Sequence, residues 1–175
     1  MDVQNRTWIE NKSSIYLPLT KATRVLEIGS FIVDGQYNLQ CRKTIEPMVG
    51  EYVGLDMRWG PGVNVVCDAK AMPPDWTESF DIVICLDTIE HMDWPHEMMP
   101  EITRVLKPGG VCYLSSVFDF AIHGFPNDYW RFTPEGIKLL LERGKLHVLE
   151  YEGVDGSPNW KPVVTRGVGK KPCVS

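Results

Sequence analysis

Five short apolar segments rich in β-branched residues recur along this chain, separated by stretches of helical or loop character. They cover residues 24–29, 52–56, 63–68, 80–87 and 110–116. Strands that are buried on both faces lose the polar/apolar alternation and read as continuous apolar runs, as these do. Strands that alternate with helical segments are joined by right-handed crossovers into a parallel sheet. The pattern therefore predicts an α/β fold on a mostly parallel sheet.

The intervening helical segments carry start and stop signals. An apolar stripe over residues 98–106 leads into residues 107–110, Lys-Pro-Gly-Gly, which is typical of a helix end. Because proline cannot donate its backbone hydrogen bond, Pro100 predicts a kink or a late start in this helix. Residues 133–135, Thr-Pro-Glu, predict the beginning of another helix, which would run to Gly144.

Length and composition limit the class of protein. The 175 residues correspond to one domain over 1–175. Residues 1–20 could form a lid. Residues 146–152 and 163–169 are weaker strand candidates. A net charge of −5 argues against nucleic-acid binding, and no apolar run approaches the roughly 20 residues that span a bilayer. The five cysteines lack a C-x-x-C motif and are expected to be reduced packing residues. Together with an N-terminus unlike a signal peptide, this predicts a cytoplasmic protein.

The first four predicted strands end in a glycine or a carboxylate, namely Gly29, Asp56, Asp68 and Asp87. A single aspartate at a strand end is usually a turn former or a helix cap. In an open α/β sheet, however, ligands bind beyond the carboxyl ends of the strands. Four such ends at one edge therefore predict a crevice that suits a nucleoside with a cationic tail.

The order of these segments resembles the motifs of class I S-adenosylmethionine-dependent methyltransferases, over about residues 24–145. Residues 123–136, HGFPNDYWRFTPEG, are similar to a segment that follows the fifth strand in a bacterial and archaeal branch of small methyltransferases. The motifs that carry the resemblance are Val25-Leu26-Glu27-Ile28-Gly29, Gly54-Leu55-Asp56, Cys67-Asp68-Ala69, Phe80-Asp81-Ile82-Val83, Glu90-His91-Met92 and Arg104-Val105-Leu106-Lys107-Pro108-Gly109-Gly110.

The resemblance implies a Rossmann-like three-layer sandwich whose seven-stranded sheet has the order 3-2-1-4-5-7-6, with strand 7 antiparallel. It also implies S-adenosyl-L-methionine as cofactor. Asp56 would accept hydrogen bonds from the ribose hydroxyls, and Asp68 and the Ala69 N–H would contact adenine. Gly29 would let the backbone approach the methionine portion, Asp87 would lie near the sulfonium, and Glu27 would mainly support the loop.

One position departs from the family pattern. The first loop of the family commonly reads Gly-x-Gly-x-Gly, whereas Phe31 stands at the second glycine here. Either Gly35 supplies the missing flexibility or cofactor affinity is reduced, so a catalytically silent cofactor- or partner-binding module is the alternative to an enzyme. A nicotinamide fingerprint would need glycine at Phe31 and Asp34, which argues against a dehydrogenase.

Two histidines that follow strands, His123 and His91, are the candidate catalytic bases, although either could be structural. Glu90, His91, Asp93 and His96 form a local cluster, but their spacing matches no standard metal site, so no metal is predicted. The aromatic segment 118–132 either packs on the sheet edge or forms an acceptor wall. We expect methyl transfer to an oxygen or nitrogen of a small-molecule or glycan acceptor, without nucleic acid or membrane, by a chain that could form a homodimer.

Overall fold

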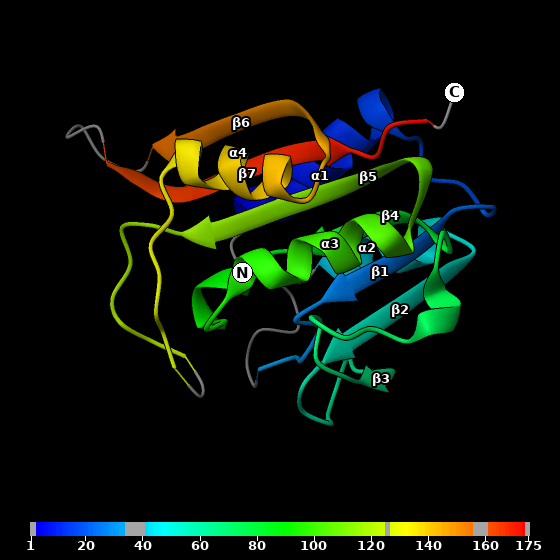
Figure 1. Cartoon of the computed structure of the whole chain (residues 1–175), viewed down its shortest axis with the longest axis horizontal. Helices are drawn as coiled ribbons and strands as arrows, with labels where there is room; N and C mark the ends of the chain where they lie inside the picture. Colours follow the sequence, from blue (N-terminus) through cyan, green and yellow to red (C-terminus); the bar gives the residue numbers. More distant parts are fainter. Residues whose placement is uncertain (1–2, 34–40, 125–126, 156–160, 174–175) are drawn as a thin grey trace.

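The computed structural model describes residues 3–33, 41–124, 127–155 and 161–173 (Figure 1). Within these residues a seven-stranded sheet has the order β3-β2-β1-β4-β5-β7-β6. Strands β1 to β5 pair in parallel, and β7 pairs antiparallel with both β5 and β6. The strands are β1 Arg24–Ile28, β2 Glu51–Asp56, β3 Val65–Val66, β4 Phe80–Cys85, β5 Leu106–Val117, β6 His147–Asp155 and β7 Pro162–Lys170. The predicted strand order and the antiparallel strand are confirmed.

Helices cover both faces of this sheet, which gives three layers. Helices α3 and α4 lie in front of the sheet in Figure 1, and α1 and α2 lie behind it. The helices are α1 Val3–Tyr16, α2 Cys41–Ile45, α3 Pro95–Val105 and α4 Pro134–Arg143, with short 3-10 turns η1 Glu46–Met48, η2 Pro74–Trp76 and η3 Ile89–His91. The predicted sandwich is therefore confirmed.

Each face of the sheet packs a separate apolar cluster. Leu26 and Ile28 of β1 pack with α3 and α4, whereas Val25 packs with α1 and α2 on the opposite face. Because successive side chains of a strand point to opposite faces, both sets must be apolar. This double burial explains the continuous apolar runs in the sequence.

The boundaries of α3 and β5 differ from the prediction. Helix α3 begins at Pro95 and contains Pro100, so it does not start late. Burial of Met98, Met99 and Ile102 against the sheet outweighs the one backbone hydrogen bond that Pro100 cannot make. Strand β5 begins at Leu106, directly after the helix, and so includes residues 107–110. The register between β4 and β5 is irregular at this point, which accommodates the Pro-Gly-Gly run.

The helix start at residues 133–135 is confirmed. Thr133 is the N-cap of α4, and its side chain accepts a hydrogen bond from the backbone N–H of Gly136. Pro134 occupies the first helical position, where no backbone N–H is needed. The helix ends at Arg143, just before Gly144.

Helix α1 is fixed to the sheet near β5 and β6. The Trp8 indole meets the Tyr113 ring edge-on, with ring centroids 5.6 Å apart. Lys12 Nζ lies 2.6 Å from a carboxylate oxygen of Glu150, and the Tyr16 hydroxyl donates to the same carboxylate at 2.9 Å. The lid function of residues 1–20 stays a prediction.

Three of the five cysteines, Cys41, Cys85 and Cys112, are buried and reduced. Cys67 is half-buried and Cys173 is exposed, so the packing role does not extend to Cys173. None of the helices in the described part of the chain combines the length and apolar character that crossing a bilayer requires.

Candidate functional site

The carboxyl ends of β1, β2, β3 and β4 meet at one edge of the sheet, as their parallel pairing requires. Gly29 follows β1 with a φ of +76°, in the left-handed region that favours glycine. Its N–H donates to the Leu55 carbonyl at 2.9 Å. The turn after β1 is thus held against β2, close to the residue that ends it.

Asp56, at the end of β2, lies beside the first loop. One carboxylate oxygen, Oδ2, accepts from the Phe31 backbone N–H at 3.3 Å, and the other accepts from the Arg58 backbone N–H at 2.9 Å. The Arg58 guanidinium stacks over the Phe31 ring, 4.3 Å from its centroid. Phe31, which replaces the expected glycine, therefore packs beside Arg58 and contributes its backbone to the Asp56 site. Gly35 lies outside the described residues.

Asp68 and Ala69 follow β3 and form a short turn. Asp68 Oδ1 accepts from the Lys70 N–H at 2.9 Å, which is the turn-forming role of such an aspartate. Ala69 is buried in the cluster under α3 and α4. Both residues stand at the strand end where an adenine contact was predicted.

Asp87 follows β4 in the left-handed region, with a φ of +46°. The Ser115 hydroxyl donates to Asp87 Oδ1 at 2.9 Å, and the Asp87 N–H donates to the Ser115 carbonyl at 3.1 Å. This pair ties the turn after β4 to the neighbouring strand β5. A strained backbone held in this way orients the carboxylate at the strand end.

Glu27 lies apart from these residues. Its side chain points to the face covered by α1 and α2, where it is buried and close to Tyr52 and Arg42. Burial raises the pKa of Glu27 to about 7, although the Tyr52 hydroxyl and the Arg42 charge act in the opposite direction. This placement suits support of the first loop better than contact with a cofactor.

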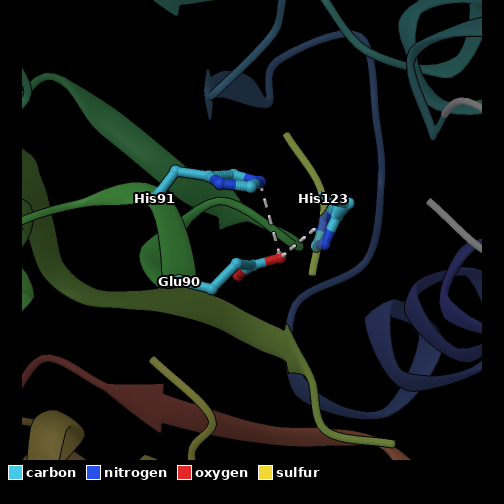
Figure 2. Close-up of side chains that lie close together, drawn as sticks. All are labelled: Glu90, His91 and His123. Atoms are coloured by element: carbon cyan, nitrogen blue, oxygen red, sulfur yellow. Dashed lines mark ion pairs between the residues drawn. The ribbon is translucent and has the colours of Figure 1, made fainter. Parts of the chain in front are cut away.

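The two candidate bases lie together although 32 positions separate them in sequence. The rings of His91 and His123 meet edge-on with centroids 4.9 Å apart. Figure 2 shows the Glu90 carboxylate extending between them, and Glu90 Oε1 lies 4.0 Å from Nε2 of each histidine. Glu90 is fully buried, and burial, followed by the Asp87 charge, raises its pKa to about 8.

A second carboxylate, Asp128, organises the segment that carries His123. Asp128 accepts the His123 backbone N–H at 2.9 Å, and its Oδ2 lies 3.1 Å from His123 Nδ1. Arg131 binds both carboxylate oxygens of Asp128 and also donates to the carbonyls of Phe120 and Ala121. Hydrogen bonding from Arg131 is the main cause that lowers the pKa of Asp128 well below its usual range.

The aromatic segment 118–132 packs on the turn after β4. The Tyr129 N–H donates to the Glu90 carbonyl at 2.7 Å, and the Trp130 indole N–H donates to the Met92 carbonyl at 2.9 Å. Tyr129 and Trp130 nonetheless keep 51% and 40% of their surface exposed. Half-exposed rings beside the histidines are compatible with an acceptor wall. Phe125 lies outside the described residues.

The cluster of Glu90, His91, Asp93 and His96 suggested by the sequence differs from the one in the structure. Asp93 and His96, which the local cluster included, point elsewhere: Asp93 pairs with Lys70 at 2.8 Å, and His96 packs against Trp94. Among the described residues, the group of acidic, histidine and cysteine side chains close enough to share an ion is Glu90, His91 and His123. The sequence contained the adjacent Glu90-His91 pair, but nothing local indicated that His123 lies beside it.

Comparisons with known proteins agree with this architecture. Residues 46–114 match the family model of a methyltransferase domain. A ubiquinone biosynthesis O-methyltransferase of Pseudomonas fluorescens is 36% identical over 92 residues, which cover 47% of this chain and 36% of that protein. The chain thus matches about a third of the length of this curated relative.

Solved structures show the same fold at low identity. An S-adenosylmethionine-dependent methyltransferase of Clostridium acetobutylicum aligns with a TM-score of 0.72 and 12% identity, over 98% of this chain and 93% of that one. The 1,6-didemethyltoxoflavin-N1-methyltransferase of Burkholderia thailandensis, solved with S-adenosylhomocysteine bound, has a TM-score of 0.68 and 15% identity over 97% and 77%.

The fold is therefore that of the class I methyltransferases. The sequence matches cover part of the chain and agree with the resemblance seen in its motifs.

Proposed function

We propose that this protein transfers a methyl group from S-adenosylmethionine to an oxygen of a small hydroxylated acceptor. The observation that carries the proposal is the row of strand ends at one edge of the sheet, where Gly29, Asp56, Asp68 and Asp87 follow four neighbouring parallel strands. The match of residues 46–114 to a methyltransferase domain supports it.

The side chains at this edge fit the cofactor by their chemistry. Asp56, Asp68 and Asp87 offer carboxylate oxygens, which accept hydrogen bonds from hydroxyl and amino groups and attract a sulfonium, whereas phosphates would be repelled. Asp56 Oδ2 has one partner, the Phe31 backbone N–H, and retains a lone pair for a ribose hydroxyl, whereas Oδ1 accepts from both the backbone N–H and the Nε of Arg58. The cofactor, when bound, supplies an electrophilic methyl group on a positively charged sulfur.

The acceptor is placed on the side of Glu90, His91 and His123. This cluster follows β4 and β5, next to Asp87, and the Phe120 ring meets the His123 ring edge-on with centroids 4.8 Å apart. The relative from Pseudomonas fluorescens is named an O-methyltransferase, which favours oxygen over nitrogen as the acceptor atom. Glycan hydroxyls share this chemistry and belong in the same test.

His123 is the proposed base when the cluster is free of other ligands. Its Nδ1 faces the Asp128 carboxylate, which favours the tautomer with the proton on Nδ1 and a lone pair on Nε2. That lone pair can take the proton of an acceptor hydroxyl. Positioning of the acceptor and cofactor supplies much of the rate enhancement in such an in-line displacement.

A methyl-transfer screen tests the proposal. The protein is incubated with S-adenosylmethionine and phenols, nucleotide sugars, oligosaccharides or small amines, and S-adenosylhomocysteine release is measured. We expect turnover with a hydroxylated acceptor, and slower turnover with Asp56→Ala when the cofactor concentration is close to the parent's Kd. Cofactor binding without turnover on any hydroxylated acceptor would contradict the proposal.

The alternative, a silent cofactor- or partner-binding module, has one observation in its favour. Phe31 and Arg58 already engage both oxygens of Asp56, so a ribose would share the carboxylate with them. Failure of S-adenosylmethionine and S-adenosylhomocysteine to bind would favour this alternative. The homodimer and the cytoplasmic location stay predictions.

A further inference from the structure

One oxygen of the Glu90 carboxylate lacks a hydrogen-bond partner. Glu90 Oε2 accepts from the Ser116 hydroxyl at 3.0 Å, whereas Oε1 is buried without a hydrogen-bond partner. The whole residue has no exposed surface. A buried carboxylate oxygen without a partner is energetically costly, so the environment of Glu90 Oε1 points to a ligand that binds this oxygen.

Both neighbouring imidazoles present a nitrogen lone pair to this oxygen. His91 Nδ1 lies 2.7 Å from the Asn127 carbonyl, so it must carry the proton and donate. His123 Nδ1 lies near the Ala121 carbonyl and the Asp128 carboxylate, and it donates for the same reason. In the neutral form of each ring Nε2 then carries the lone pair, and it faces Glu90 Oε1, as Figure 2 shows.

We propose that Glu90 Oε1, His91 Nε2 and His123 Nε2 together bind a divalent transition-metal cation such as Zn²⁺ or Co²⁺. Two imidazoles and one carboxylate are a preferred ligand set for these ions. The three atoms come from the turn after β4 and the segment after β5, two regions that the fold brings together.

The spacing of the three atoms suits this role. They all lie within 4.8 Å of one another. A tetrahedral ion with bonds of about 2.0–2.2 Å separates its ligands by about 3.3–3.6 Å. Glu90 Oε1 lies 4.0 Å from each nitrogen, so an inward shift of about half an ångström, within reach of small side-chain rotations, completes the site.

Outer partners hold each imidazole in the orientation that metal binding needs. Histidine ligands almost always donate their second ring N–H to a carboxylate or a backbone carbonyl, and both arrangements occur here. Gly124 adds a steric constraint, because a Cβ there would lie 2.1 Å from His91 Cε1. The close approach of residue 124 to the His91 ring therefore requires glycine.

The open side of the site faces solvent. The side chains of His91 and His123 are 20% and 29% exposed, whereas Glu90 closes the buried side. A fourth ligand would therefore be a water molecule or an oxygen of a bound molecule. If the proposed function holds, that oxygen belongs to the methyl acceptor, and the ion uses the lone pair that His123 otherwise offers as a base.

A cobalt titration tests the site directly. Protein freed of metal with a chelator is titrated with Co²⁺ in the absence of cofactor and acceptor, and the visible d–d absorption is recorded. We expect saturation at one equivalent in the parent. Binding should weaken at least tenfold in Glu90→Gln and in His123→Ala, and should not change in His96→Ala, an exposed histidine outside the cluster.

Three results would overturn the proposal: no d–d absorption in the parent, equal binding in parent, Glu90→Gln and His123→Ala, or a thiolate charge-transfer band that assigns the ion to cysteine. Circular dichroism shows whether each variant folds. If Glu90→Gln does not fold, His123→Ala decides, because the His123 side chain keeps 29% of its surface exposed. Since neither cofactor nor acceptor is present, the outcome does not depend on methyl transfer.

Discussion

Gly29 and Thr88 approach so closely that a Cβ on Gly29 would lie 2.1 Å from Thr88 Oγ1. The two residues follow β1 and β4, which are neighbours in the sheet. Thr88 Oγ1 in turn donates to the Leu86 carbonyl at 2.9 Å, so the threonine cannot easily turn away. The contact fixes the turn after β1 against the turn after β4, at the edge where we place the cofactor.

Gly29→Ala should lower the free energy of unfolding by about 1–3 kcal/mol, because alanine must adopt a positive φ and displace Thr88. Urea denaturation measures this effect. Gly136→Ala is the matched control, since its Cβ meets no atom closer than 3.5 Å and α4 favours alanine over glycine. Equal stability of the parent and Gly29→Ala would show that the described contact is wrong.

Glu27→Gln should make stability less dependent on pH. The pKa of Glu27 is raised to about 7 in the folded protein, so an unfolded chain loses this proton at lower pH than the folded one does. The parent therefore loses stability as pH rises from about 4.5 to 7, and the loss, up to about 3 kcal/mol, is complete above pH 7.

Denaturation of parent and Glu27→Gln at several pH values between 4.5 and 8.5 measures the difference. We expect the free energy of unfolding of Glu27→Gln to rise relative to that of the parent across this window, and the difference to level off above pH 7. Tyr52, Arg42 and Glu46 are the groups that act on Glu27, so Glu142→Gln, at an exposed position of α4, serves as control. Parallel pH profiles of the parent and Glu27→Gln would contradict the buried, protonated carboxyl.

His123→Ala and Arg131→Ala should affect different properties of the protein: the first its turnover, the second its stability as well. His123→Ala should lower kcat about 10²–10⁴-fold and leave the Kd for S-adenosylhomocysteine nearly unchanged, because the imidazole lies beside Glu90, where we propose that the acceptor binds. Arg131 instead binds Asp128 and two backbone carbonyls, so Arg131→Ala should lower the melting temperature as well as turnover.

Turnover, melting temperature and cofactor affinity of both variants are measured together, with Lys161→Ala as an exposed control. If His123→Ala unfolds or loses cofactor affinity in proportion to turnover, the histidine is structural. If Arg131→Ala keeps the parent's melting temperature, its contacts with Asp128 do not hold the segment.

The sequence predicted the sheet because the signals for it are local. Each apolar run followed by Gly29, Asp56 or Asp87 marks both a buried strand and the point where it ends, whereas the run before Asp68 forms only the short, partly exposed strand β3. The start of β5 was missed because Pro108 and Gly109 normally end an element, whereas here an irregular stretch of the ladder accommodates them. Whether a strand accepts a proline and a glycine depends on its neighbouring strands, which are far away in the sequence.

The candidate site was predicted only in part. His91 and His123 were both identified, but their contact was not, since it depends on how the segment after β5 returns over the turn after β4. Glu90 looked like part of a local cluster with Asp93 and His96, and only the fold shows that its carboxylate points between the two histidines. Side-chain direction at a turn is set by tertiary packing, which no local pattern records.

The central claim is that the strand ends bind S-adenosylmethionine through Asp56, and calorimetric titration with S-adenosylhomocysteine tests it most directly. We expect one equivalent to bind the parent. Asp56→Ala should weaken binding by about 1.5–3 kcal/mol, the range for hydrogen bonds to a charged group, and Asp119→Ala, an exposed control, should bind as the parent does. Absence of binding to the parent, or unchanged affinity in a folded Asp56→Ala, would contradict the account.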